Sequence, residues 1–178
     1  MKKLLITILI IPFFISVVAQ DKEKVLSQAD QFSARSGALI QKEFIEIGNA
    51  KALDIKIIRI KDLNSGSKIS ALRFEYTYPS AYSSDTYIAT LDSDEIDGLI
   101  KSISNIQNNV FNTTCSNYTE YIYRSRGGFE FGAFYSKEEQ KWSPFVKLDK
   151  YTNKSLYPLK IEDIINFLSL IQKAQSLL

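Results

Sequence analysis

Residues 68–78 have the sequence KISALRFEYTY, in which polar and apolar side chains alternate from end to end. In an extended chain, successive side chains point to opposite faces. One face then carries Ser70, Leu72, Phe74, Tyr76 and Tyr78. The other face carries Ile69, Ala71, Arg73 and Glu75. This pattern predicts a half-buried antiparallel strand, because such sheets commonly pack one face on a core and turn the other to solvent.

A helix with a clear beginning follows the next predicted strand, which covers residues 86–91. Asp92 suits an N-cap, and Glu95 stands three residues later, as a capping box requires. The apolar residues that follow share one helical face: Ile96, Leu99, Ile100, Ile103 and Ile106. This spacing predicts an amphipathic helix that ends near residues 108–109.

Upstream of residue 68, two segments rich in β-branched residues predict a hairpin. They cover residues 39–47 and 52–61 and are separated by Gly48 and Asn49, which favour a turn. In the second segment one face carries Leu53, Ile55 and Ile57, and the other carries Ile58 and Ile60. Before the hairpin, residues 22–35 have the spacing of a short amphipathic helix.

The second half of the chain repeats the same order. Alternating patterns predict four strands, at residues 118–125, 128–135, 141–150 and 156–159. A last helix is predicted over residues 161–178, and a shift of 68 residues lays Ile96 on Ile164 and Leu99 on Phe167. Helical periodicity alone can produce such a match, so duplication and coincidence both stay open. The matching order of the strands before each helix favours duplication.

The sequence therefore predicts an α+β fold with antiparallel sheets in a ββββα-ββββα duplication, each helix packing on a sheet, plus a short N-terminal helix. The two halves would cover residues 39–109 and 116–178. If each sheet is covered by the helix of its own half, the product is a two-layer or pseudo-two-fold α+β domain. Residues 20–178 are numerous enough to form one globular domain with a sizeable core.

The N-terminus has the pattern of a signal peptide. Lys2 and Lys3 precede an apolar run over residues 4–18, and Ala19 suits the last position before cleavage. The run is shorter than the roughly 20 residues that a helix needs to cross a bilayer. We therefore expect residues 1–19 to be removed, with no stable membrane anchor left, and the protein to be periplasmic or secreted.

The net charge and the cysteine content limit the kinds of partner that we expect for this protein. The chain has 22 basic and 20 acidic side chains, and loss of Lys2 and Lys3 with the leader balances them. A neutral domain attracts polyanions weakly, which argues against nucleic acid as the main partner. Cys115 is the only cysteine, so no intrachain disulfide can form. An inert thiol is favoured there, while a disulfide-linked dimer and a reactive role stay open.

The residues that usually carry catalysis or bind metals are scarce. The chain has no histidine and one cysteine, so we expect no zinc or copper site, no cofactor and no assigned catalytic residue. Asp92, Asp94 and Asp97 resemble the start of a calcium loop, but Ile103 stands where the last ligand should be. A glycosidase-like hydrolase needs only two carboxylates. The candidates are Asp94, Glu95, Asp97, Glu130, Glu162 and Asp163.

Tyrosines are the remaining candidates for a ligand-binding site. The candidate ligand-binding residues are Tyr76, Tyr78, Tyr82, Tyr87, Tyr121 and Tyr123. A tyrosine combines an apolar ring with a hydroxyl group, so such a group could stack on a sugar or anchor a protein partner. Packing between neighbouring strands is the alternative, and it is the more common role of aromatic pairs in sheets.

Four segments together resemble a group of uncharacterised exported bacterial proteins: residues 42–48 (KEFIEIG), 62–66, 91–100 and 127–130. This resemblance covers most of the chain after the leader and implies export but no activity. Separately, the repeated ββββα order resembles the whirly and PUR-repeat folds in topology. That second resemblance implies binding of single-stranded nucleic acid, although the chain lacks the net positive charge such binding needs.

The sequence thus favours an exported, non-enzymatic protein that binds an unknown protein or carbohydrate ligand. The alternatives are a carboxylate-dependent hydrolase and a relative of single-strand-binding folds.

Overall fold

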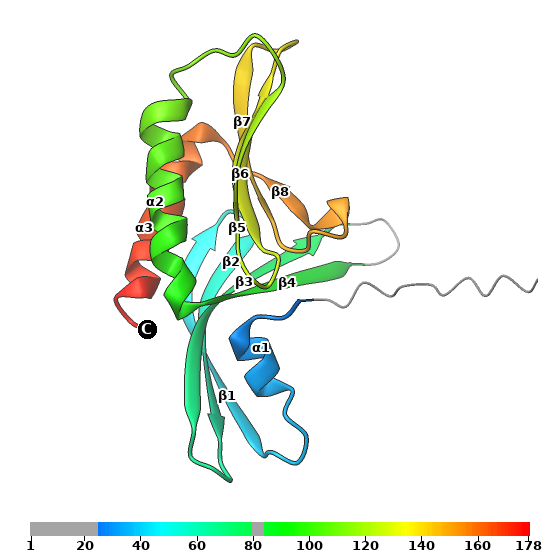
Figure 1. Cartoon of the computed structure of the whole chain (residues 1–178), viewed down its shortest axis with the longest axis vertical. Helices are drawn as coiled ribbons and strands as arrows, with labels where there is room; N and C mark the ends of the chain where they lie inside the picture. Colours follow the sequence, from blue (N-terminus) through cyan, green and yellow to red (C-terminus); the bar gives the residue numbers. More distant parts are fainter. Residues whose placement is uncertain (1–24, 80–83) are drawn as a thin grey trace, which may run out of the picture.

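A computed structural model describes residues 25–79 and 84–178 (Figure 1). The predicted leader, residues 1–19, lies outside the described residues, and so does Tyr82. The α+β prediction is confirmed: two four-stranded antiparallel sheets are each followed by a helix, and a short helix comes first. In the described part of the chain, no helix is both long and apolar enough to cross a membrane.

The first sheet, sheet A, has the strand order β1-β2-β3-β4. The elements of this half are α1 (Gln28–Ser33), β1 (Ile40–Ala50), β2 (Leu53–Asp62), β3 (Lys68–Tyr78), β4 (Asp85–Asp92) and α2 (Ile96–Asn105). A 3-10 turn (Ser93–Glu95) leads into α2, and a π-helical turn (Ile106–Val110) continues it. The capping box is present, with the Glu95 carboxylate accepting from the Asp92 amide at 3.2 Å.

The second sheet, sheet B, has the order β5-β6-β7-β8. The elements of this half are β5 (Thr119–Arg124), β6 (Glu130–Ser136), β7 (Lys141–Lys147), β8 (Leu156–Pro158) and α3 (Ile164–Gln175). A 3-10 turn (Asn153–Ser155) precedes β8, and another (Ile161–Asp163) precedes α3. Each half thus has the predicted order of four strands and a helix.

The first hairpin differs in detail from the prediction. Gly48 does not end a strand; it lies within β1, where the pairing with β2 shifts between Glu46 and Gly48. The turn comes later, at Lys51 and Ala52. Gly48 has a φ of +151°, which residues with side chains rarely adopt, and a Cβ atom there would lie 2.7 Å from Leu170 Cδ2 of α3, so glycine suits a place where a helix packs against the strand.

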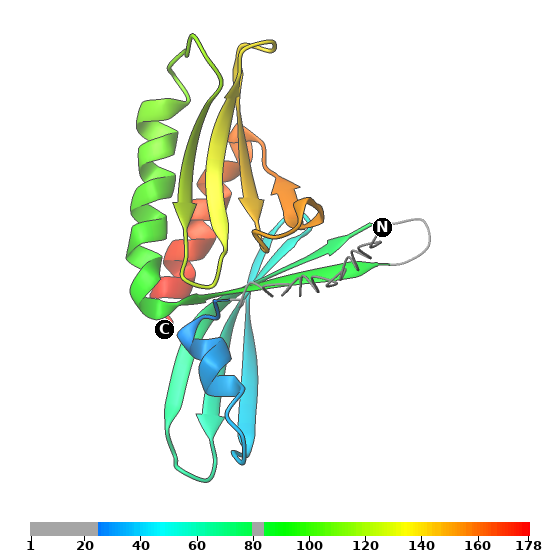
Figure 2. The same cartoon turned by 45° about the vertical axis from the view of Figure 1, so that its right-hand side comes forward.

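The two helices pack across the two halves. α2 follows sheet A but lies on β5 and β6 of sheet B. α3 follows sheet B and contacts both sheets: it lies beside β1 and β2, and its Phe167 ring lies 5.7 Å from that of Phe131 in β6. Figures 1 and 2 show the two helices side by side along sheet B. Gly98 lies where α2 contacts β5, because a Cβ atom there would lie 3.3 Å from the Tyr123 ring.

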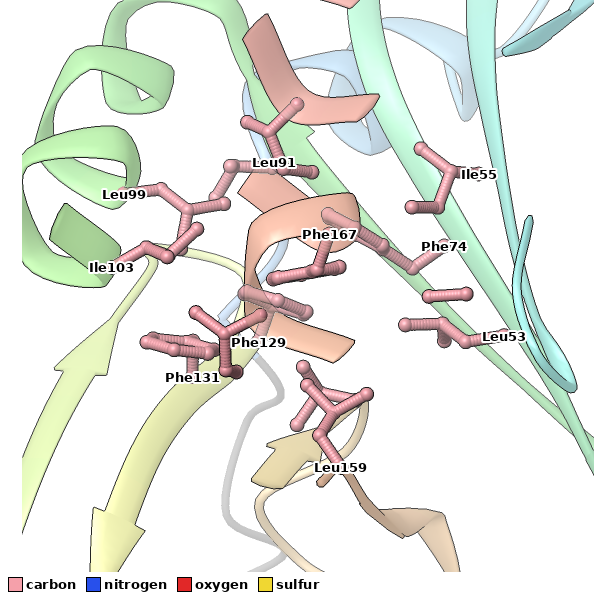
Figure 3. Close-up of a cluster of buried hydrophobic side chains, with 14 of the residues drawn as sticks. Leu53, Ile55, Phe74, Leu91, Leu99, Ile103, Phe129, Phe131, Leu159 and Phe167 are labelled. Carbon is pink, nitrogen blue, oxygen red and sulfur yellow. The ribbon is translucent and has the colours of Figure 1, made fainter. Parts of the chain in front are cut away.

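Both halves contribute to one continuous core (Figure 3). The Phe74 ring from sheet A stacks on Phe129 with centroids 4.4 Å apart, and Phe167 of α3 stacks on Phe131 at 5.7 Å. Figure 3 shows these rings between the strands of the two sheets, with Leu99 of α2 to one side. The main core therefore belongs to neither half alone.

A second, smaller core lies on the opposite face of sheet A. There α1 packs Ala29 and Phe32 against Ile58, Ile60 and Ala71. This explains why β2 is apolar on both faces: one face meets α3 and the main core, and the other meets α1.

Candidate functional site

The predicted tyrosines do not gather on one surface. Tyr76 is buried, and its ring lies 4.9 Å from that of Tyr157. Tyr78 and Tyr87 are half-buried and pack against the main core. Tyr76 therefore packs sheet A against β8, and all three residues contribute to the core rather than to an open surface.

Tyr121 and Tyr123 belong to β5, on the other sheet. Tyr121 is exposed, and its ring lies 5.6 Å from that of Trp142. Tyr123 donates its hydroxyl to Glu95 O at 2.9 Å. Desolvation by burial, with a smaller effect of the charges of Glu95 and Asp94, raises the pKa of Tyr123 to about 12. Tyr123 thus fastens β5 to the beginning of α2.

Most of the candidate carboxylates are bound to bases or amides at separate places. Glu130 pairs with Arg124 at 2.8 Å. Asp163 pairs with Lys51 at 2.6 Å, and the hydrogen bond from Lys51 lowers its pKa. The other two are Asp97, which accepts from the Gln175 amide, and Glu162, which lies 3.4 Å from Lys160 Nζ. This distribution does not form the pair of facing carboxylates that glycoside hydrolysis requires.

Asp94 and Glu95 do lie together, in a cluster with Asp92 around Arg126. The guanidinium donates to Asp92 at 2.6 Å and to Asp94 at 2.8 Å, and the Arg126 amide donates to Glu95 at 2.6 Å. The hydrogen bond from Arg126 lowers the pKa of Asp94, and the same contact is the main cause that raises the pKa of Arg126.

Asp92 also binds the first helix. Its two carboxylate oxygens accept from the amides of Gln28 at 2.8 Å and Ala29 at 3.0 Å, at the beginning of α1. Carboxylate oxygens of Asp92, Asp94 and Glu95 lie within 4.8 Å of one another, a spacing that could suit a metal ion. The donors of the protein itself already bind these oxygens, so the cluster joins α1, the beginning of α2 and the β5–β6 turn.

Cys115 is half-buried and packs against the main core. It lies in the segment between the π-helical turn and β5.

A hollow of about 520 Å³ lies on the outer face of sheet B, which we call the sheet B hollow. Its lining combines apolar, aromatic and charged side chains: Glu120, Ile122, Arg124, Glu130, Phe145, Lys147, Lys150, Tyr151, Asn153 and Leu156. The strands supply the floor, and the segment between β7 and β8 supplies one wall. The sequence analysis singled out only Glu130 of these residues.

The register of sheet B arranges the floor in rows. Ile122 pairs with Gly132, and Gly132 pairs with Phe145, so an apolar row crosses three strands. The Phe145 ring lies against Gly132, where a Cβ atom would lie 3.1 Å from Phe145 Cζ and 2.5 Å from Tyr121 O. Gly132 therefore permits the close contact that forms the floor.

Two cations of the hollow have no carboxylate partner among the described residues. Lys147 Nζ donates to Lys150 O and to Asn153 Oδ1, each at 3.3 Å. Lys150 Nζ lies 5.0 Å from the ring centroid of Tyr151, which is 49% exposed. The hollow is thus lined by two ammonium groups and an exposed aromatic ring, and the Lys150 ammonium lies beside that ring.

A larger hollow, about 640 Å³, lies on the inner face of sheet A beyond the ends of the helices. Its polar lining includes Gln41, Glu43, Arg59, Lys61, Lys68 and Ser70, with no aromatic residue. Arg59 is engaged within it, because its guanidinium donates to Leu177 O at 3.2 Å and lies 3.7 Å from Glu43. The sheet B hollow therefore offers the richer set of ligand contacts.

Comparisons with protein-family models, with curated proteins and with solved structures found no significant match. The resemblance to exported bacterial proteins and the topological resemblance to whirly and PUR-repeat folds thus stay predictions.

Proposed function

We propose that the protein acts outside the cytoplasm as a non-enzymatic binding protein, and that its ligand is an acidic saccharide bound in the sheet B hollow. One observation carries this proposal. Lys147 and Lys150, which form no ion pair among the described residues, line the hollow together with Tyr151 and an apolar floor.

The chemistry of a uronic acid matches these groups. The C–H face of a pyranose ring packs on an aromatic ring such as that of Tyr151, and on an apolar surface such as the Phe145 row. A carboxylate on the sugar accepts charge-assisted hydrogen bonds from ammonium groups, and these are stronger than neutral ones. Arg124 would contribute less, because Glu130 already binds it.

Calorimetric titration with oligogalacturonate, with an uncharged maltooligosaccharide in parallel, tests the proposal. We expect the acidic ligand to bind and its affinity to fall as the salt concentration rises. The saccharide should be recovered uncleaved after the titration. Equal binding of the neutral sugar would contradict the role of the lysines. Release of shorter saccharides would contradict a non-enzymatic function.

Matched variants locate the site. Tyr151→Ala and Lys150→Glu should each weaken binding by about tenfold or more, because each removes a contact inside the hollow. Tyr118→Ala and Lys137→Glu are the controls, because these exposed residues lie outside the lining of the hollow. Unchanged binding in the Tyr151 and Lys150 variants would place the ligand elsewhere.

Export is tested separately. Protein recovered from outside the cytoplasm should begin at Gln20 when its N-terminus is sequenced. An intact Met1 on the recovered protein would contradict removal of the leader.

A further inference from the structure

Three of the four edge strands carry features that hinder pairing with another chain. β1 has a register shift between Glu46 and Gly48, and Lys173 Nζ donates to Ile47 O at 2.8 Å. The second half of β4 lies beside α1. β8 has three residues and ends at Pro158. Bulges, short strands, proline and covering helices are the usual protections of sheet edges.

The fourth edge strand of the described sheets, β5, has no register shift and no proline; α2 packs on its inner face, but Tyr121 and Ile122 stay exposed. Its residues are TEYIYR, without glycine, proline or lysine, and its pairing with β6 runs from Thr119 to Arg124 without a shift. The large apolar side chains Tyr121 and Ile122 are exposed on it. In Figure 2, β5 forms the border of sheet B next to α2.

The hydrogen-bonding groups of β5 that point outward can be assigned from its register. The Ser125 amide donates to Phe129 O at 2.8 Å, which identifies a hydrogen-bonded pair. Such pairs alternate along an antiparallel ladder, so Tyr123 and Tyr121 also bond to β6. The backbone groups of the intervening residues, Glu120, Ile122 and Arg124, therefore point away from sheet B.

The same three residues are complementary to themselves. If two β5 strands pair antiparallel about Ile122, Ile122 meets Ile122, and Glu120 of each copy faces Arg124 of the other. The outward backbone groups of all three residues then bond in register. Opposite charges that face each other across strands stabilise an antiparallel pair, and like charges destabilise it.

The side chains on the inner face also fit this pairing. Tyr121 of one copy lies directly opposite Tyr123 of the other. A groove of about 190 Å³ runs between β5 and α2, lined on the helical side by Ser102, Asn105, Ile106 and Val110. In the dimer, Tyr123 of the other copy would cover the exposed Tyr121 beside this groove.

We propose that the protein forms a symmetric homodimer through β5, in which the two B sheets join into one eight-stranded antiparallel sheet. The partner is a second copy of this chain, because in the self-paired register Glu120 of each copy faces Arg124 of the other, where it adds a second carboxylate beside the one that Glu130 supplies. The dimer does not rest on saccharide binding. It places both sheet B hollows on one continuous face.

Sedimentation of the purified protein tests the proposal over a range of concentrations. We expect the wild type to sediment at twice the monomer mass and Ile122→Lys to sediment as a monomer, because two lysines would then meet at the symmetry axis. Ile165→Lys is the matched control, since Ile165 is 66% exposed on α3, away from β5. A wild type that stays monomeric, or an Ile122→Lys variant that stays dimeric, would overturn the proposal.

A charge exchange tests the register. Glu120→Arg and Arg124→Glu should each weaken the homodimer by about tenfold or more, since each creates two like-charge pairs. An equimolar mixture of the two variants should dimerise again, because every facing pair is then opposite in charge. A mixture that stays monomeric while both variants are folded would refute this register.

Hydrogen exchange tests the β5 pairing on the wild-type protein itself. The amides of Glu120, Ile122 and Arg124 should become protected as the protein concentration rises. Protection that instead requires an added foreign peptide would show that another chain occupies the edge, and it would overturn the homodimer.

Discussion

Replacement of Asp92 by alanine should destabilise the protein far more than replacement of Asp94, although both carboxylates bind Arg126. The Asp92 side chain is 4% exposed and accepts from two α1 amides and the guanidinium. Loss of one partner of a buried ion pair costs about 3–5 kcal/mol, which includes the penalty for the unpaired donors left behind. The Asp94 side chain is 57% exposed, and such a pair contributes about 0–1 kcal/mol.

Urea unfolding followed by circular dichroism measures both values. With a slope of about 2 kcal/mol per molar urea, Asp92→Ala should lower the midpoint by roughly 1.5–2.5 M. Asp94→Ala should lower it by less than about 0.5 M. In hydrogen exchange, α1 should lose protection first in Asp92→Ala. Equal shifts for the two variants would refute the idea that Asp92 joins α1 to the rest of the molecule.

Three further results are expected. Gly132→Ala should destabilise the protein by about 1–3 kcal/mol in urea unfolding, because the added methyl group overpacks β5 and β7. Spectrophotometric titration should show one phenol with a pKa of about 12 that disappears in Tyr123→Phe. Burial raises the pKa of Glu75, but hydrogen bonds from Arg73 and Lys56 outweigh it and lower the pKa overall. The ionised Glu75 carboxylate therefore stabilises the fold at neutral pH, and this contribution is lost as the pH falls below about 4. Glu75→Gln should make the urea midpoint depend less on pH over that range.

The order of elements was predictable because each has a strong local signal. The alternation over residues 68–78 and the capping box at Asp92 and Glu95 both depend on neighbours within a few residues. The position of α2 on sheet B was not predictable, since an apolar stripe on a helix does not say which sheet it will cover. Gly48 was interpreted as a turn for the same reason: its close contact is with Leu170, which is distant in sequence.

The candidate site was harder to predict than the fold. Six tyrosines were singled out by residue type, but residue type alone does not separate buried Tyr76 from exposed Tyr121. The sheet B hollow depends on which residues of neighbouring strands lie side by side, and that register is set by the turns. Strand alternation could have placed Phe145 and Lys147 on one face, yet Lys150 and Tyr151 join them only through the loop after β7.

The order of the elements along the chain also bears on when the main core can close. Sheet A is complete in the sequence before α3 begins, yet its inner face packs against α3, which contributes Phe167 and Ile171 to the core. The outer face of sheet A already has a packing partner in α1, which precedes it. The small core on that outer face can therefore form first, whereas the main core closes only when α3 is available.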